Sequence, residues 1–181
     1  MKKKVNENRE ALVMEWYELY YEDIYRFILF MMDDKQSCED FVHDTFVRAY
    51  TAYEYFNYRS SIKTWLFSIA KHIVMDEIRK RKRRKLFLSF APEKDIPSSF
   101  NVEQYVENKQ TVRQLIESLF RLKSNYRLVI ILRKIEGFST KEAADILNWS
   151  EDKVRKTLSR ALQALRKMTE DEGGEQVEKS V

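Results

Sequence analysis

The sequence predicts an all-α protein made of two small helical domains joined by a flexible linker. Apolar residues recur along most of the chain at spacings of about three and four, which is the pattern of one face of a helix. The 181 residues include only three glycines and two prolines, and both prolines, Pro92 and Pro97, lie within residues 88–100. No segment alternates as a strand does, and no internal repeat is present.

These signals divide the chain into four parts. We expect a first domain over residues 10–86, a linker over 87–103 and a second domain over 104–169. The last residues, 170–181, are acidic and contain two glycines, so they are expected to form a solvated tail.

Composition narrows the class of protein. Hydrophobic residues make up 44% of the chain and charged residues 34%, which suits a folded protein with a core. Cys38 is the single cysteine, and no Cys/His cluster has zinc spacing, so we expect a reducing compartment such as the cytoplasm, with no metal or cofactor. Neither a secretory signal nor an apolar run of about 18 residues that could span a membrane is evident.

Three helices, or four, are expected in the first domain. The second of them has Ser37 as a candidate N-cap, and the third begins near Ser60 or Ser61 and runs into the unbroken basic segment "RKRKRRK", residues 79–85. The first helix has a stripe of apolar residues that we expect to be buried: Ala11, Leu12, Trp16, Leu19, Tyr20, Ile24, Phe27, Ile28 and Met31.

The second domain should end in a helix-turn-helix. Two helices precede Gly137, the expected left-handed stop. Ser139 and Glu142 form a capping box for a short helix that ends near Leu147. A turn at Asn148 and a cap at Ser150 then begin a longer helix over 151–166.

The longer helix has one apolar face and one basic face. A helix of this kind fits the major groove of DNA, where a helix-turn-helix presents the N-terminal residues of its second helix to base edges. A helical hairpin with an ordinary solvated Lys/Arg face would show the same pattern, so spacing alone leaves both interpretations open. The basic residues outside the apolar stripe are Lys153, Arg155, Lys156, Arg160, Arg166 and Lys167.

Three segments together resemble the extracytoplasmic-function sigma factors of bacterial RNA polymerase. They are "SCEDFVHDTFVRAY", "FNYRSSIKTWLFSIAKHIVMDEIRKRKRR" and "EGFSTKEAADILNWSEDKVRKTLSRALQALRK". The resemblance covers about residues 12–168 in the family's order. It implies sigma domain two over 10–86 and sigma domain four over 104–169.

By this resemblance, Asp40, Phe41 and Asp44 contact core RNA polymerase. Asp40 and Asp44 are four residues apart and share a helix face, as a charged protein interface requires. The same carboxylates could instead belong to an ordinary solvated face, or to the acid/base or metal site of a helical nucleic-acid enzyme. No histidine, cysteine or nucleophile motif accompanies them.

The segment from Phe56 to Arg79 resembles the part of domain two that melts and reads the minus-ten element. Single-stranded DNA needs aromatic faces for its bases and cations for its backbone, and this segment supplies both. Phe56 and Tyr58 could equally pack in the core. The resemblance assigns to the minus-ten element Phe56, Asn57, Tyr58, Arg59, Ser60, Lys63, Lys71, His72 and Arg79.

By the same comparison, Arg155, Lys156, Ser159 and Arg160 face the minus-thirty-five element, with Arg155 as the main base contact. Lys153 is assigned to the same element, by contact with phosphate or only with water. The family usually has asparagine at the position of His72, a departure that bears on base preference.

The sequence therefore indicates an alternative sigma factor that catalyses no reaction and acts with core RNA polymerase and promoter DNA. The resemblance also implies an anti-sigma factor as a partner, which in this family is often membrane-bound. The alternative is a classical helix-turn-helix regulator that binds operator DNA without polymerase.

Overall fold

The computed structural model describes residues 2–32, 34–88 and 110–178, with side chains over 9–32, 34–87 and 115–169. All regular structure in these ranges is helical, which confirms the all-α prediction. The predicted linker, 87–103, began too early, because residues 87 and 88 still belong to the third helix of the chain; the rest of it and the helical pattern just before Gln110 lie outside the described residues. The chain divides into two compact units, described separately below.

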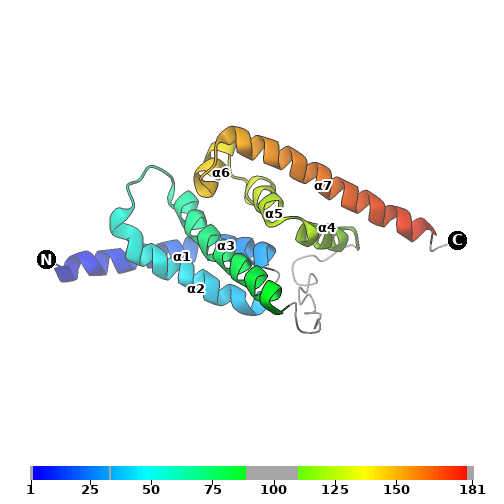
Figure 1. Ribbon diagram of the computed structural model, residues 1–181. Helices are drawn as coiled ribbons and strands as arrows, with labels where there is room; N and C mark the ends of the chain where they lie inside the picture. Colours follow the sequence, from blue (N-terminus) through cyan, green and yellow to red (C-terminus); the bar gives the residue numbers. More distant parts are fainter. Residues whose placement is uncertain (1, 33, 89–109, 179–181) are drawn as a thin grey trace. The chain divides into compact units, whose positions relative to one another are not determined.

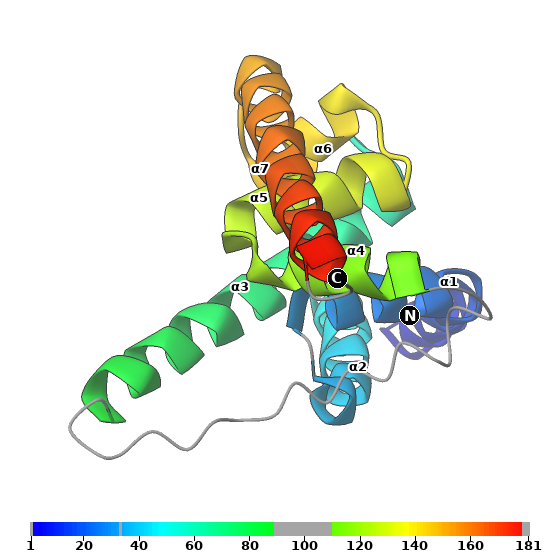
Figure 2. The ribbon, with the colours of Figure 1, turned by 90° about the vertical axis from the view of Figure 1, so that its right-hand side faces the viewer.

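The first unit consists of three long helices that pack against one another (Figures 1 and 2). They are α1 (Lys2–Met32), α2 (Lys35–Ala52) and α3 (Ile62–Leu88). A short 3-10 turn, Tyr53–Tyr55, follows α2 and leads into the loop before α3. The core contains side chains from all three helices that are less than 2% exposed: Ile24, Phe27, Ile28, Met31, Val42, Leu66, Phe67 and Val74.

The α1 stripe was predicted only in part. Trp16 and Ile24 are buried as expected, but Ala11 is exposed and Leu19 is 61% exposed, so those two assignments were wrong. Val13 lies on the buried face instead. Periodicity decides less sharply between the buried and the exposed face for residues at the edge of a stripe. A single exposed leucine is also common on soluble proteins.

The N-cap of α2 also differs from the prediction. Asp34, and not Ser37, caps the helix, with its Oδ1 accepting a hydrogen bond from the backbone N–H of Ser37 at 3.3 Å. The Ser37 hydroxyl donates to Oδ2 of Asp34 at 2.8 Å. Both residue types are favourable N-caps. The helix begins after Asp34 because the Asp34 carboxylate accepts from the backbone N–H of Ser37, which a cap at Ser37 itself could not satisfy.

The second unit contains α4 (Gln110–Arg121), α5 (Ser124–Ile130), α6 (Thr140–Leu147) and α7 (Glu151–Glu178). A π-helical turn, Ile131–Ile135, continues α5. Both α4 and α5 pack against α7. The buried side chains of this unit include Leu128, Ile131, Leu132, Val154 and Ala161.

Local signals around the helix-turn-helix agree with the prediction. Ser139 and Glu142 form the reciprocal capping box, with N–H to side-chain oxygen distances of 2.8 and 3.1 Å. Gly137 and Asn148 adopt left-handed conformations, with φ of 74° and 53°. The hydroxyl of Ser150 accepts from the N–H of Lys153 at 3.2 Å at the start of α7.

Helix α7 is longer than predicted. The sequence suggested an end near residue 166 and a solvated tail, whereas the helix continues to Glu178. Gly173 and Gly174 each cost about 1 kcal/mol relative to alanine within a helix, but a glycine does not end a helix unless the chain turns there. No proline follows α6 to force an earlier stop.

Candidate nucleic-acid interface

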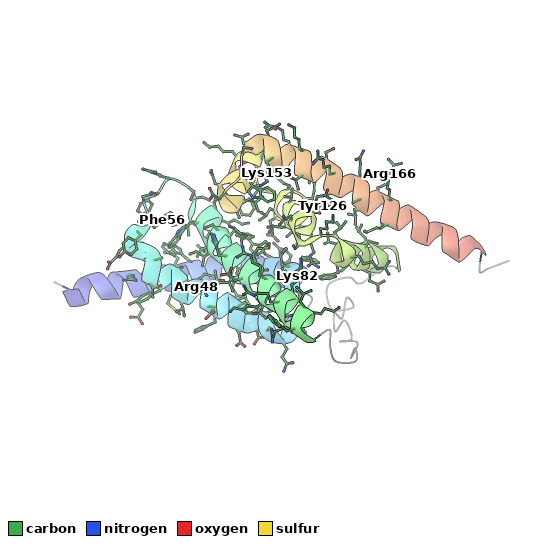
Figure 3. The ribbon with its side chains drawn as sticks, viewed as in Figure 1. Arg48, Phe56, Lys82, Tyr126, Lys153 and Arg166 are labelled. Atoms are coloured by element: carbon green, nitrogen blue, oxygen red, sulfur yellow. The ribbon has the colours of Figure 1, made fainter. Side chains whose placement is uncertain are left out.

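The loop between α2 and α3 separates two aromatic side chains that the sequence could not tell apart. Phe56 is only 8% exposed and stacks on Trp65, with ring centroids 4.5 Å apart. Tyr58 is 69% exposed, and its ring lies 4.7 Å from that of Phe56. Phe56 therefore packs inward and supports Tyr58, which presents an aromatic face to solvent; Figure 3 labels Phe56 in this loop.

The backbone of this loop is fixed by local contacts. Tyr58 has a φ of 57°, a conformation that a bulky side chain rarely adopts. Asn57 accepts a hydrogen bond from the N–H of Arg59 at 3.2 Å through its side-chain oxygen. Asn57 and Arg59 are exposed and Ser60 is half-buried, so the predicted loop residues other than Phe56 remain accessible.

Two aromatic residues that were not assigned to the site complete this cluster. Trp16 lies edge-on to Trp65, with ring centroids 6.0 Å apart, and also contacts Tyr53 at 5.7 Å. The Tyr53 hydroxyl lies 3.3 Å from the Tyr58 hydroxyl. The dense aromatic run "YEYFNY" is a signal for such a cluster, but the contribution of Trp16 from α1 depends on tertiary structure.

The ends of the predicted minus-ten surface on α3 carry ion-paired cations. Lys63 Nζ lies 2.6 Å from Oδ2 of Asp23, and Arg79 lies 2.8 Å from Asp76. Burial acts to raise the pKa of Asp23, but hydrogen bonds from Lys63 and Arg26 hold that pKa below its ordinary value. Both cations stay at least partly exposed and can still exchange a carboxylate for a phosphate.

Lys71 is the predicted site residue that the structure buries. Its exposure is 8%, and this burial lowers the pKa of its ammonium group. Its Nζ lies 3.2 Å from Nε2 of His72, whose Nδ1 lies 2.7 Å from the carbonyl oxygen of Ser68. Since a carbonyl only accepts, Nδ1 carries the proton and Nε2 accepts from Lys71. Lys71 thereby orients the exposed His72 ring.

The predicted polymerase contact lies on α2. Asp40 and Asp44 are exposed and one turn apart, whereas Phe41 is half-buried. The carbonyl oxygen of Phe41 accepts from the hydroxyl of Thr45 at 2.7 Å. This face of α2 also carries Val47, which is 45% exposed, so it combines carboxylates with an apolar patch. Figure 3 labels the next residue along the helix, Arg48.

The first turns of α7 present their cations on the outer face. Val154 is fully buried, while Arg155 and Lys156 are exposed. Arg155 pairs with Glu151 at 3.3 Å and Lys156 with Asp152 at 2.7 Å, each one turn earlier. Hydrogen bonding to Lys156 lowers the pKa of Asp152.

The rest of this surface follows along the same helix. The Lys153 ammonium lies 4.2 Å from the ring centroid of Trp149, a cation–π contact. Ser159 and Arg160 are exposed. Figure 3 shows Lys153 near the start of α7 and Arg166 further along it. All five predicted minus-thirty-five residues thus lie on the accessible surface of one helix.

Neither a metal cluster nor a membrane span is found in the described ranges. No group of three or more histidine, cysteine or carboxylate residues there could hold a metal ion. None of the described helices combines the length and apolar character needed to cross a bilayer.

Comparison with known protein families identifies the family to which this chain belongs. An aromatic and basic loop on one helical unit, with a basic helix-turn-helix on another, is typical of a DNA-binding transcription factor. The family model for Sigma-70 region 2 matches residues 16–84, and that for Sigma-70, region 4 matches residues 112–165. The chain belongs to the sigma-70 family, in its extracytoplasmic-function branch, and is therefore an alternative sigma factor that directs RNA polymerase.

Two relatives from Bacillus subtilis (strain 168) support this conclusion. The ECF RNA polymerase sigma factor SigX is 35% identical over 163 residues, which cover 85% of this chain and 81% of SigX. SigM is 32% identical over 155 residues, covering 84% of this chain and 91% of SigM.

A solved structure has the same fold. The sigma factor RpoE, in its co-crystal structure with the anti-sigma factor NepR from Bartonella quintana, aligns with a TM-score of 0.73 at 24% identity. The alignment covers 87% of this chain and 96% of that chain.

Proposed function

We propose that the first unit of this sigma factor opens the minus-ten region and holds its unpaired bases. The observation that carries this proposal is the loop before α3, in which a buried Phe56 supports an exposed Tyr58. Base stacking on an aromatic face contributes about 1 to 3 kcal/mol per base, and nearby cations bind the backbone. Asn57, Arg59 and Ser60, which neighbour Tyr58 in the loop, are proposed to contact a displaced base.

The α3 helix continues this surface. Lys63, His72 and Arg79 are accessible from solvent and supply cations and a hydrogen-bonding ring along the path of the strand. Lys71 acts through His72, because its ammonium is buried and donates to the imidazole. This assignment differs from direct DNA contact by Lys71.

The second unit is proposed to read the minus-thirty-five element in duplex form. Arg155, Lys156, Ser159 and Arg160 are exposed along α7, whose opposite side is anchored in the core by Val154. Arg155 near the N-terminal end is the proposed base contact. Lys153 is proposed to contact phosphate.

The acidic face of α2 is proposed to dock on core polymerase. Asp40 and Asp44 supply charge and Phe41 supplies apolar area at its edge. A charged rim steers association, and an apolar centre holds the complex. The chain is proposed to supply no catalytic group of its own and to act in the cytoplasm.

An inhibitory partner is also proposed. The RpoE structure contains the anti-sigma factor NepR, and the CnrH structure, which aligns at a TM-score of 0.68 and 21% identity, contains the cytosolic domain of CnrY. By analogy, we propose that an anti-sigma factor covers the polymerase-binding surfaces of this chain. The family resemblance implies that such a partner would be anchored in the membrane.

Run-off transcription tests the proposed function. The purified chain is added to bacterial core polymerase and genomic DNA, and the 5′ ends of the transcripts are sequenced. We expect start sites that appear only with the chain and share two upstream elements. A gel shift with and without core enzyme separates the two candidate functions, since an ordinary regulator would bind its operator tightly alone. Absence of any chain-dependent transcript would refute promoter selection.

A further inference from the structure

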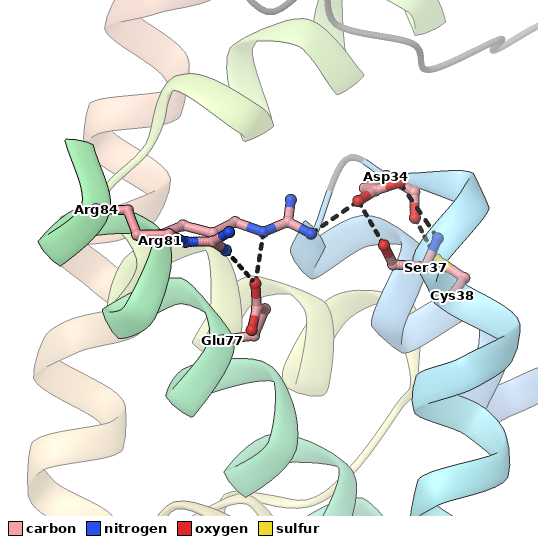
Figure 4. Close-up of polar contacts among 6 residues, drawn as sticks. All are labelled: Asp34, Ser37, Cys38, Glu77, Arg81 and Arg84. Carbon is pink, nitrogen blue, oxygen red and sulfur yellow. Dashed lines mark hydrogen bonds and ion pairs between the residues drawn. The ribbon is translucent and has the colours of Figure 1, made fainter. Parts of the chain in front are cut away.

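Carboxylates hold several of the basic side chains of this chain. In the first unit, Nη2 of Arg81 lies 2.7 Å from Oδ2 of Asp34, and its Nε lies 3.1 Å from Oε1 of Glu77. Arg84 reaches the same Glu77 oxygen at 3.1 Å. Figure 4 shows this network, in which Arg81 lies between the two carboxylates. A cation paired in this way must leave its carboxylate before it can bind a phosphate.

The cations at the start of α7 have partners of two kinds. Arg155 and Lys156 pair with carboxylates one turn earlier, at 3.3 and 2.7 Å. At the same spacing Lys153 has the ring of Trp149, with its ammonium 4.2 Å from the ring centroid. Within the part of the chain that the structure describes, Lys153 is in no ion pair. A ring attracts an ammonium without cancelling its charge, so Lys153 keeps its charge and N–H donors for another acceptor.

The position of Lys153 is unfavourable for a cation by local rules. The hydroxyl of Ser150 caps α7 by accepting from the N–H of Lys153, which places Lys153 in the first turn. That turn is the positive end of the helix dipole, where acidic residues stabilise a helix and basic residues do not. Glu151 and Asp152 follow this rule, and Lys153 breaks it. A residue that breaks a local rule calls for a compensating contact or a functional reason.

Trp149 is anchored between α6 and α7. Its backbone N–H donates to the carbonyl oxygen of Ala144 at 3.0 Å, and the preceding residue, Asn148, has a left-handed φ of 53°. Trp149 is half-buried, whereas Lys153 is exposed. Because an indole side chain has only two rotatable bonds, an anchored ring restricts the lysine chain that lies against it. The ammonium is thus held in place while it stays accessible to solvent.

We propose that Trp149 is a positioning residue that holds Lys153 as a preorganised phosphate contact at the start of α7. This proposal rests on the proposed function, in which α7 binds duplex DNA. Because the ring already orders the Lys153 side chain, binding a phosphate costs less conformational entropy than it would for a free lysine. Because no carboxylate must be displaced, Lys153 binds the backbone before Arg155 and Lys156 exchange their partners. Trp149 itself needs no contact with DNA.

A double-mutant cycle measures the coupling of these two residues in DNA binding. Fluorescence anisotropy of a labelled mixed-sequence duplex follows binding of the full chain, without polymerase, from about 50 to about 200 mM KCl. Trp149→Leu, which keeps an apolar side chain but has no aromatic face, is measured in the unchanged chain, in Lys153→Ala and in Lys156→Ala. Lys156 is the matched control, because it is an exposed cation of the same helix that pairs with Asp152 and not with the ring.

The expected effect of Trp149→Leu depends on the background. It should weaken binding about two- to fivefold in the unchanged chain and in Lys156→Ala, as loss of one exposed cation–π contact would, and should have no effect in Lys153→Ala. Lys153→Ala alone should reduce the slope of log K against log salt by about 0.9, the effect of one phosphate contact. Trp149→Tyr, which keeps an aromatic face, should lose less affinity than Trp149→Leu.

Several results would overturn the proposal. Equal losses for Trp149→Leu in all three backgrounds would give Trp149 a DNA contact or a structural role of its own. No loss, or a gain, in the unchanged chain would show that the ring does not assist Lys153. An unchanged salt slope in Lys153→Ala would show that Lys153 binds no phosphate. Circular dichroism verifies the folding of each variant, and Trp149→Met repeats the cycle if Trp149→Leu does not fold.

The proposed function is tested separately, because the duplex contains no promoter and the assay no polymerase. Coupling between Trp149 and Lys153 without any chain-dependent transcript would support the positioning role and refute promoter selection. Chain-dependent transcripts together with an additive cycle would refute the positioning role and leave promoter selection supported.

Discussion

The hydroxyl groups of Tyr53 and Tyr58 lie 3.3 Å apart, within hydrogen-bonding distance. This contact joins the turn after α2 to a loop residue that is mostly exposed and has positive φ. Trp16 and Trp65 support the two ends of the contact, through Tyr53 and Phe56 respectively. The proposed base platform is thus positioned by an aromatic cluster and does not depend on the loop alone.

Replacing Tyr53 by phenylalanine should weaken promoter opening while the fold persists. The change removes one exposed hydrogen bond, worth about 0.5 to 1.5 kcal/mol, and leaves the rings in place. We expect a two- to tenfold loss of permanganate-reactive thymines in the minus-ten region. Tyr55→Phe is the matched control, because Tyr55 is 84% exposed and lies in the same turn. Equal losses in both variants would argue against a positioning role for Tyr53.

Phe56 and Tyr58 should respond differently to truncation. Phe56→Ala removes a buried ring that stacks on Trp65, and we expect a loss of about 2 to 4 kcal/mol in urea unfolding. Tyr58→Gly relieves a positive φ and should leave stability unchanged or slightly raised, while promoter opening falls. If Tyr58→Gly opened promoters normally, Tyr58 would not be the platform.

Lys71→Met should stabilise the protein at neutral pH. The pKa of Lys71 is lowered from 10.5 mainly by burial, so its charged form is unfavourable in the folded state. Because the folded pKa is the lower one, this penalty applies at pH values below it and disappears as the pH rises towards 10.5. Chemical denaturation at pH 7 and at pH 10 would show the gain and its decline. Lys82→Met, an exposed position on the same helix, should change stability little.

Asp34→Asn should show how much the charge of Asp34 contributes to stability, apart from its contribution as the N-cap of α2. Asparagine is as good an N-cap as aspartate, so the variant loses mainly the ion pair with Arg81, and we expect a cost of about 1 kcal/mol at pH 7. Burial opposes the shift, but hydrogen bonds from Ser37 and Arg81 hold the pKa of Asp34 below 3.8. The wild-type advantage is therefore present above that value and lost as the pH falls through the folded pKa. Equal pH profiles for both proteins would contradict the network.

Arg155→Ala should reduce affinity for the minus-thirty-five element by about 1 to 3 kcal/mol and relax preference at one base pair. Lys153→Ala should instead weaken all sequences alike and flatten the salt slope by about 0.9. Holoenzyme binding to a library of minus-thirty-five variants at two salt concentrations measures both effects. A uniform loss for Arg155→Ala would assign that side chain to the phosphate backbone.

Local rules in the sequence predicted the helix-turn-helix well. Ser139, Glu142 and Ser150 act within one helical turn, and Gly137 and Asn148 supply the left-handed conformations that their residue types favour. Such interactions depend on neighbours along the chain, so periodicity and capping patterns are enough to find them.

Tertiary context decided the features that the sequence could not supply. Asp34 and Ser37 are both favourable N-cap residues, and the ion pair of Asp34 with Arg81, 47 residues away, is a contact that the sequence does not show. Lys71 reads as an available cation until the packing of α3 is known, since its neighbours Lys63 and Arg79 remain accessible. The burial of Phe56, which stacks on Trp65, and the exposure of Tyr58, which has a positive φ, likewise depend on tertiary structure.

Under the proposed role of α7, the ion pairs of Arg155 with Glu151 and of Lys156 with Asp152 would make DNA recognition an exchange of ionic partners. A phosphate or base would have to displace the carboxylate of Glu151 or Asp152, so a poorly placed DNA contact would gain little net free energy. Only an acceptor placed better than the resident one gains from the swap. If α7 binds DNA as proposed, its acidic first turn would lower the affinity for random sequence, and neutralising Glu151 and Asp152 would raise affinity at the expense of discrimination.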